Sequence, residues 1–177
     1  MSQPVPTRLT PLDESAWAPA LESVRNGLGT VLNVHRMMAH HPELLAAWTP
    51  LRQHITNGGT LSARHRELII LRVAALAGVA YEWHHHVARA SLAGIGPTEV
   101  EAVRIAKATD WPDEQESALL AATDELFQSL AVGDDVWAVL TELFTVPQIL
   151  DLIVTVGMYT TLAMFINTTG VQIEAGT

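Results

Sequence analysis

The pattern of hydrophobic and polar positions along the chain predicts helices and almost nothing else. No stretch alternates between apolar and polar residues with turn signals at its ends, which is the pattern of a strand. Prolines, glycines and capping residues separate the apolar stretches, and Thr98 followed by Glu101 has the spacing of a capping box. The sequence therefore predicts an all-α protein. We expect helices at residues 15–26, 30–40, 42–56, 63–77, 80–93, 98–108, 112–130, 134–144 and 147–170.

Two of these helices are joined by a very short link. Ser62 is a good N-cap for the helix at 63–77, and Gly78 ends that helix. The next helix, at 80–93, starts almost at once and closes at Gly94. A link this short favours an antiparallel hairpin, and we place that hairpin at the centre of the fold.

The first residues differ in composition from the rest of the chain. Residues 1–14 contain three prolines and no apolar core of the kind that a secretory signal needs. We expect them to form an extended N-terminal arm, and we expect the protein to be cytoplasmic. Residues 15–177 are long enough for one domain with a sizeable core and short for two. The prediction is a single helical domain behind the arm.

Composition and charge restrict the possible partners. Apolar residues make up 49% of the chain and charged residues 16%, which is a low charge content for a monomer. We therefore expect a homo-oligomer with part of the apolar surplus in its interfaces. The net charge of -9, with no basic cluster, argues against nucleic acid as a partner. Residues 149–166 have about the length of a bilayer span, but Asp151, Gly157 and several threonines interrupt them, so we expect no membrane contact.

The chain contains no cysteine, which excludes disulfides, thiolate metal sites and thiol redox chemistry. Any reaction must use carboxylates, imidazoles or a bound cofactor. Glu82 and His86 are four residues apart, so on a helix their side chains share one face and can act on the same small molecule. Glu67, on the first helix of the hairpin, is the third candidate for catalysis.

The run His84, His85 and His86 suggests a metal site, but consecutive helical residues point about 100° apart and cannot converge on one ion. Only His86 shares a face cleanly with Glu82, and His85 is the three-residue neighbour. Glu67, Glu82 and His86 could offer two carboxylates and an imidazole, yet no HExxH or second-histidine spacing supports such a site. We therefore expect neither a native metal nor a cofactor.

Several candidates also have a structural interpretation. Glu67 has Arg64 three residues before it, so an ion-paired role in holding a helix stays open beside a catalytic one. Arg72 lies in an apolar run, where a buried pair with a carboxylate is favoured over an anchor for a substrate carboxylate. The other candidates for substrate binding are Trp83, His85, Tyr159 and Asn167. Core packing is the default role for Trp83, and a helix interface would also use Tyr159 and Asn167.

The hairpin segments RHRELIILRVAAL and YEWHHHVARASLAGIGPTEVEAV resemble the signature of the carboxymuconolactone decarboxylase family, which is related to the AhpD-like alkylhydroperoxidases. The flanking segments MMAHHPELLAAW and DLIVTVGMYTTLAMFINTTGVQIE are similar to the same family, so the resemblance covers most of the chain from about Val31 onward. It implies an AhpD-like helical fold with a central antiparallel hairpin. It also implies a homo-oligomer, either a trimer or a hexamer built from trimers.

The resemblance also assigns positions within the hairpin. The peroxidase branch uses a glutamate, a CxxC pair and a histidine four residues after the second cysteine. Glu67 and His86 match the glutamate and the histidine, whereas Val79 and Glu82 fall where the two cysteines would be. Thiol peroxidase activity is therefore excluded, because neither a valine nor a glutamate can replace a reactive thiol.

The decarboxylase branch also lacks those cysteines, and its ExxxH arrangement is similar to Glu82 and His86. The resemblance implies a cofactor-independent lyase or isomerase that acts on a small carboxylate or lactone. His86 would transfer the proton, and Glu82 or Glu67 would orient it. The alternative is a non-catalytic ligand-binding or structural oligomer of the same fold, because one fold serves many functions.

Overall fold

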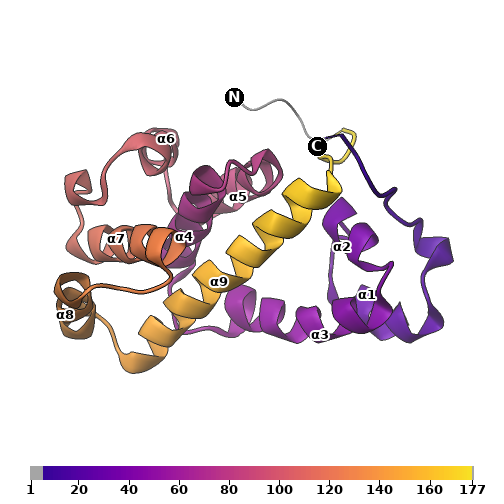
Figure 1. Cartoon of the computed structure of the whole chain (residues 1–177), viewed down its shortest axis with the longest axis horizontal. Coiled ribbons are helices and arrows are strands. Elements are labelled where there is room, and N and C mark those ends of the chain that lie inside the picture. Colours follow the sequence, from indigo (N-terminus) through magenta and orange to yellow (C-terminus); the bar gives the residue numbers. More distant parts are fainter. Residues whose placement is uncertain (1–5, 177) are drawn as a thin grey trace. The chain divides into compact units, whose positions relative to one another are not determined.

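The computed structural model describes residues 6–176, apart from the side chain of Thr109. All regular secondary structure among these residues is helical (Figure 1), so the all-α prediction is confirmed. The α-helices are α1 (Glu22–Gly27), α2 (Asn33–Met38), α3 (Pro42–Gln53), α4 (Ala63–Leu76), α5 (Ala80–Leu92), α6 (Pro97–Ile105), α7 (Glu114–Ser129), α8 (Asp134–Leu143) and α9 (Val146–Thr169). Shorter turns are the 3-10 helices η1 (Glu14–Ala16), η2 (Pro19–Leu21) and η4 (Ala108–Asp110) and the π-helical turn η3 (His54–Gly58).

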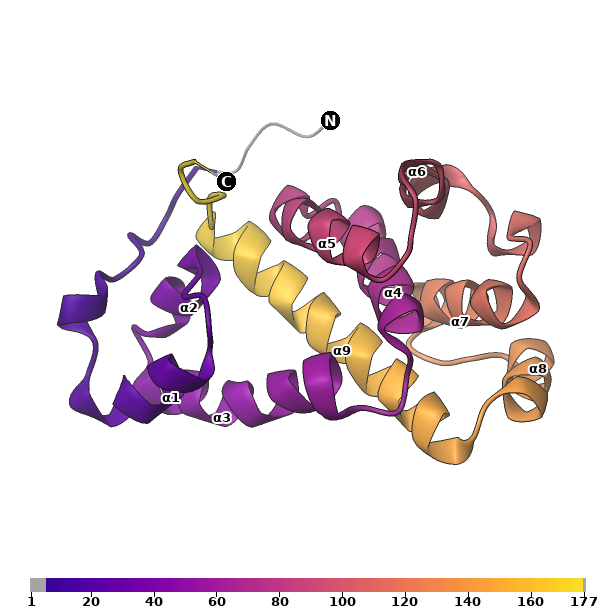
Figure 2. The same ribbon diagram turned by 180° about the vertical axis from the view of Figure 1, so that it is seen from behind.

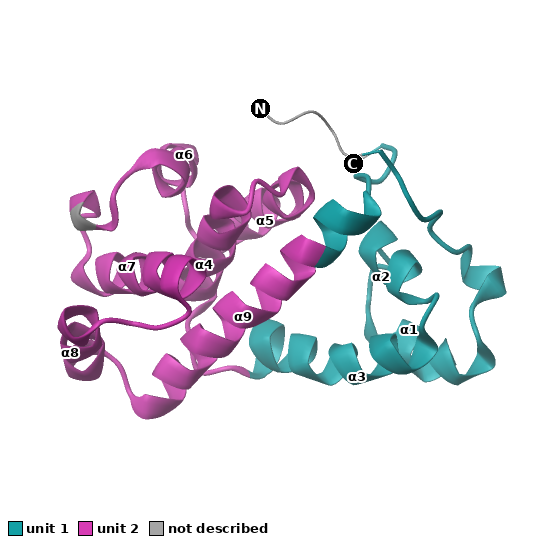
Figure 3. Cartoon of the chain, in the orientation of Figure 1, with its two compact units in different colours: residues 1–58, 165–177 teal, residues 59–164 magenta. Residues whose placement is uncertain are grey.

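The chain divides into two compact units (Figure 3). Unit 1 comprises Met1–Gly58 and Phe165–Thr177, and unit 2 comprises Gly59–Met164. The helix α9 begins in unit 2 and ends in unit 1. The division that the sequence suggests, an arm at residues 1–14 and one domain at 15–177, stays a prediction.

Residues 15–26 do not form the one continuous helix that the sequence predicted. The turn η1 is followed by extended backbone at Trp17 and Ala18. Pro19 then begins η2, and a proline disfavours the helical conformation in the residue before it. The helix therefore stops and restarts before α1.

Two polar contacts tie the C-terminal residues of unit 1 to its N-terminal part. The backbone N–H of Arg8 donates to the carbonyl of Thr169 at 2.9 Å. The backbone N–H of Asn33 donates to Glu174 Oε1 at 2.6 Å, which satisfies one of the amides that the first turn of α2 leaves unpaired.

The helix α4 is the centre of unit 2. It packs against α5, α6 and α7 (Figures 1 and 2). Every residue of α4 from Glu67 to Ala74 is buried. The predicted N-cap is present, because Ser62 accepts a hydrogen bond from the His65 N–H. Gly78 has a φ of 64°, which glycine adopts at low cost, and this lets the chain turn directly into α5. The antiparallel hairpin is thus formed by α4 and α5. The hydrophobic core around the hairpin contains Leu68, Leu71, Ala90, Ile95, Val103 and Leu120.

The start of α6 differs from the prediction. Gly96 is the N-cap and Pro97 the first helical residue, and Glu99 Oε2 accepts from the Gly96 N–H at 2.8 Å. Proline is favoured at the first helical position because its missing N–H would be unpaired there anyway. The capping box predicted for Thr98 and Glu101 is therefore wrong by two residues.

The helix α9 is long and apolar enough to cross a membrane, by length and composition alone. The core helix of a soluble protein can have the same properties, and 56% of the most apolar window of α9 is buried. Its acidic residue Asp151 accepts hydrogen bonds from the N–H and the hydroxyl of Thr60, at 2.6 and 2.7 Å. The carboxylate of Asp151 thus fixes Thr60, in the segment before α4, through two hydrogen bonds. The absence of membrane contact stays a prediction.

Candidate functional site

The hairpin brings the three predicted catalytic residues together inside unit 2. Glu67 lies in the second turn of α4, Glu82 in the first turn of α5, and His86 one turn later. His86 Nδ1 lies 2.6 Å from Glu67 Oε2, and His86 Nε2 lies 3.4 Å from Glu82 Oε2. The exposed fractions are 3% for Glu67, 5% for Glu82 and 2% for His86. One imidazole is therefore held between two buried carboxylates.

A fourth side chain contacts this cluster. Arg89 Nη1 lies 3.3 Å from His86 Nε2, one helical turn further along α5. On the other side of the cluster, Arg66 Nε lies 3.5 Å from Glu67 Oε1. Both arginines are half-buried, so they lie between the buried residues and solvent.

The contacts give the two ring nitrogens of His86 different roles. A carboxylate only accepts hydrogen bonds, so Nδ1 carries a hydrogen and donates it to Glu67. Nε2 faces an acceptor, Glu82, and a donor, Arg89. When protonated, Nε2 can donate to Glu82, and when deprotonated it can accept from Arg89. The contacts of Nε2 therefore accommodate both its protonated and its deprotonated form.

The charges of the cluster favour an imidazolium. Burial is the largest effect on the pKa of His86 and lowers it, but the hydrogen bonds and negative charges of Glu67 and Glu82 together outweigh burial and raise the pKa above its ordinary value. Burial acts on Glu67 in the opposite sense, raising its pKa. The His86 contact and the charges of Arg66 and Arg89 overcome this and lower the pKa of Glu67. A proton thus resides on the ring and not on Glu67.

Two of the predicted substrate-binding residues lie near this cluster. The ring of Tyr159, on α9, meets the His86 ring edge to face, with centroids 5.3 Å apart. Tyr159 is buried, so it fixes the plane of the imidazole. His85 precedes His86 directly on α5. Its ring packs edge to face against the ring of Tyr81, with centroids 4.6 Å apart.

Of the other three predicted substrate-binding residues, Arg72 and Trp83 make contacts with other parts of unit 2. Arg72 forms a two-point ion pair with Asp124 of α7, at 2.6 and 2.7 Å. It also donates to the carbonyls of Val103 and Ala106 at the end of α6, so its contacts fit the structural interpretation. The ring of Trp83 packs on the α6 side, under the guanidinium of Arg104. Asn167 is exposed and belongs to unit 1.

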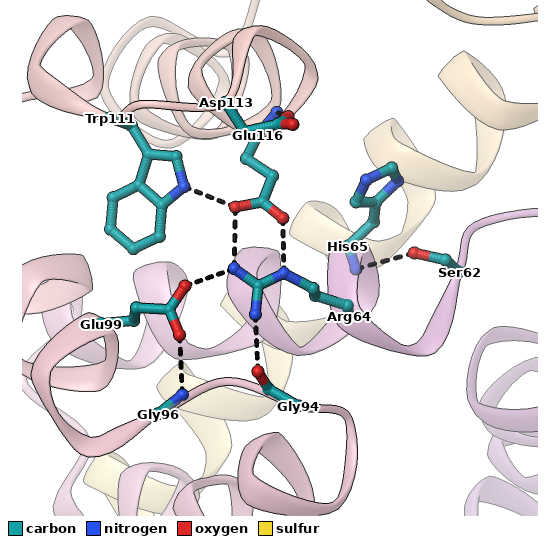
Figure 4. Close-up of polar contacts among 9 residues, drawn as sticks. All are labelled: Ser62, Arg64, His65, Gly94, Gly96, Glu99, Trp111, Asp113 and Glu116. Atoms are coloured by element: carbon teal, nitrogen blue, oxygen red, sulfur yellow. Dashed lines mark hydrogen bonds and ion pairs between the residues drawn. The ribbon is translucent and has the colours of Figure 1, made fainter.

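A second polar network holds the N-terminal end of α4 (Figure 4). Arg64 donates to Glu116 of α7, to Glu99 of α6 and to the carbonyl of Gly94. Trp111 Nε1 donates to the same Glu116 at 2.6 Å. Arg64 thus pairs with Glu116 and Glu99. The ion pair between Arg64 and Glu67 that the sequence left open is not found in the described part of the chain, where Glu67 instead contacts Arg66. This network fixes the position of α4 relative to α6 and α7, one turn before Glu67.

No group of three or more His, Asp or Glu side chains in the described part of the chain is arranged to hold a metal ion. At His86, both ring nitrogens already face side chains of the cluster. Arg89 is the site residue that sequence reasoning missed. The spacing could have identified it, because a residue three positions after His86 lies on the same helix face.

Comparisons with known proteins agree with this fold. A sequence profile of the carboxymuconolactone decarboxylase family matches residues 42–125. The AhpD core of a peroxidase-related protein from Ralstonia eutropha JMP134 has a TM-score of 0.81 at 20% identity, over 98% of this chain and 95% of that chain. A peroxidase-related protein from Silicibacter sp. TM1040 has a TM-score of 0.78 at 22% identity, over 96% and 94%.

A third similar structure is a cysteine-to-alanine variant of the debrominase Bmp8 in complex with 2,3,4-tribromopyrrole. Its TM-score is 0.80 at 22% identity, over 98% of this chain and 95% of that chain. No curated protein matches the sequence. At these identities the structures establish a shared AhpD-like helical fold.

Proposed function

We propose that this chain, whose residues 42–125 match the sequence profile of the carboxymuconolactone decarboxylase family, is a cofactor-independent lyase or isomerase acting on a small carboxylate or lactone by proton transfer. The observation that carries this proposal is the position of His86 between Glu67 and Glu82. Glu67 fixes the Nδ1 hydrogen and leaves Nε2 as the exchangeable position.

The geometry suits proton transfer to or from carbon. In a lyase reaction on a lactone acid, the bond to the carboxylate breaks and CO2 leaves. The electron pair of that bond passes into the conjugated carbonyl of the substrate, and the carbon then takes the proton of His86 Nε2. In an isomerisation, neutral Nε2 would take a proton from one carbon and return it to another. Glu67 stabilises the imidazolium in both cases, and Glu82 accepts from Nε2 between turnovers.

The rest of the site supports the same reaction class. A chain without cysteine has no thiol for peroxide reduction, and Val79 and Glu82 stand at the positions that the family resemblance gives to the cysteines. Bmp8, which shares the fold, binds a small halogenated heterocycle. This supports a small-molecule site in a protein of this fold.

The second candidate is a structural or ligand-binding oligomer in which the cluster only stabilises the hairpin. The burial of Glu67, Glu82 and His86 favours this candidate, since buried charges are commonly paired to satisfy each other. The two candidates differ in what happens when the exchangeable proton is removed.

The test is a screen of small carboxylic acids and lactones in D2O, with NMR detection of carbon-bound hydrogen exchange and of decarboxylated products. The wild-type protein should turn over at least one compound. His86→Gln should lower that rate by about 100-fold or more, with unchanged far-ultraviolet circular dichroism. Glu101→Gln, at an exposed position of α6, is the matched control and should keep the rate. Equal rates in His86→Gln and wild type would contradict the proposal and support the structural candidate.

A further inference from the structure

The arginines of the α4–α5 hairpin fall into two kinds. Arg64 and Arg72 use the Nε, Nη1 and Nη2 atoms of their guanidinium groups in hydrogen bonds to carboxylates and carbonyls. Arg66 and Arg89 make one long contact each, at 3.5 and 3.3 Å. Among residues 6–176, no other hydrogen bond or ion pair of Arg66 or Arg89 is found. Arg64 and Arg72 are therefore structural. Arg66 and Arg89 each have N–H groups that can still donate to a ligand.

Arg89 is the more informative of the two uncommitted arginines because of its position. Its Nη1 reaches the exchangeable nitrogen of His86, whereas Arg66 reaches the far side of Glu67. Holding a half-buried guanidinium beside an imidazole that is cationic when protonated is electrostatically unfavourable. A ligand that supplies negative charge at this point would remove that cost.

The charge balance of the cluster points the same way. With His86 protonated, the two carboxylates of Glu67 and Glu82 face three cations, His86, Arg66 and Arg89, which gives the site a net charge of +1. The chain as a whole carries -9. A local positive charge on an acidic protein selects for an anionic ligand.

We propose that Arg89 binds a carboxylate of the substrate and thereby places the adjacent carbon at His86 Nε2. This inference rests on the proposed function, and it narrows the substrate class to carboxylates and away from neutral lactones. The planar guanidinium presents paired N–H groups that match the two oxygens of a carboxylate. Arg89 is then the residue that determines specificity, while His86 carries the proton.

The pairing also decides which carboxylate the reaction can remove. Loss of CO2 takes a carboxylate from charged to neutral, so a guanidinium that stabilises the charged form raises the barrier. The group held by Arg89 must therefore remain on the product. A lyase substrate would carry a second carboxylate that leaves as CO2, and an isomerase substrate would need only the one that Arg89 holds.

The test measures binding and needs no turnover. Benzoate is the probe and benzamide, which has the same ring without the charge, is its neutral counterpart, and both are titrated by NMR at constant ionic strength. Wild-type protein should bind benzoate more tightly than benzamide by about tenfold, and Arg89→Gln should remove that difference. Arg104→Gln, which removes the guanidinium of an exposed residue on α6, should retain that difference.

Two further variants keep the test decisive. Arg89→Lys retains the positive charge but lacks the paired N–H groups of the guanidinium, so it should bind benzoate with intermediate affinity. Equal binding of benzoate and benzamide, or full benzoate binding in Arg89→Gln, would overturn the inference. Benzoate binding retained in His86→Gln would separate this result from any failure of the catalytic proposal.

Discussion

Replacing Glu67 with glutamine tests the electrostatics of the cluster directly. The substitution keeps the shape of the side chain and its ability to accept from His86 Nδ1, at the position where the two side chains now lie 2.6 Å apart. It removes the negative charge. Burial, the largest effect on the pKa of His86, would then meet weaker opposition, so the pKa of His86 should fall relative to the wild-type protein.

The expected loss of stability follows from the kind of contact that is removed. A hydrogen bond to a charged group contributes about 1.5–3 kcal/mol and the neutral hydrogen bond that glutamine retains contributes about 1 kcal/mol, so the net loss should be about 1 kcal/mol. For a protein of this size that corresponds to a decrease in Tm of about 2–4 °C. Both side chains are at least 95% buried, so solvent screening does not reduce this figure much.

The loss should depend on pH in a defined direction. The raised pKa of His86 gives stability that is fully present below the ordinary value of 6.5 and is lost as pH rises through the folded-state value. The lowered pKa of Glu67 gives stability that is present above its ordinary value of 4.5 and is lost as pH falls through the folded-state value. The pair therefore stabilises most in the interval between those two ordinary values.

Urea denaturation at about pH 6 and pH 9 measures this, with Glu101→Gln as the exposed control. The difference between wild type and Glu67→Gln should be largest at the lower pH and should shrink at the higher pH. A double-mutant cycle with His86→Gln should give a favourable coupling energy. A difference that is the same at both pH values, or a coupling energy of zero, would refute the ion pair between Glu67 and His86.

Two further predictions concern architecture. Asp124→Asn should lower the stability by about 3 kcal/mol, measured by urea denaturation, because it leaves the buried Arg72 without its counter-charge; an unchanged midpoint would show that the pair is not structural. The protein should also be a stable homo-oligomer at low concentration, as the low charge content suggests. Light scattering behind a sizing column should give a multiple of 19.2 kDa, and a species at 19.2 kDa itself would contradict the expectation.

The parts of the fold that the sequence predicted well have local causes. The hairpin is bounded by Ser62 and Gly78, whose capping and left-handed conformations involve only their near neighbours. The errors are local as well. Pro19 stops the first helix, and Pro97 shifts the start of α6, because the fixed φ of a proline prevails over weaker capping preferences.

The site was only partly predictable for a different reason. Glu82 and His86 share a helix face, so their proximity follows from spacing alone. The contact between Glu67 and His86 spans the hairpin and was anticipated from a family resemblance and not from geometry. The pairing of Arg72 with Asp124 joins residues on α4 and α7, and no spacing rule could identify the partner.

The two contacts of His86 Nε2 connect protonation to anion binding. When Nε2 carries a proton it donates to Glu82, and the nearby Arg89 is left to an anion. When Nε2 is deprotonated it accepts from Arg89 and competes with that anion for the same N–H group. Coupling of this kind is reciprocal, so a bound carboxylate would raise the pKa of His86 as much as a proton on His86 favours the carboxylate. A carboxylate substrate would thus itself keep the catalytic proton on the ring until the reacting carbon is in place.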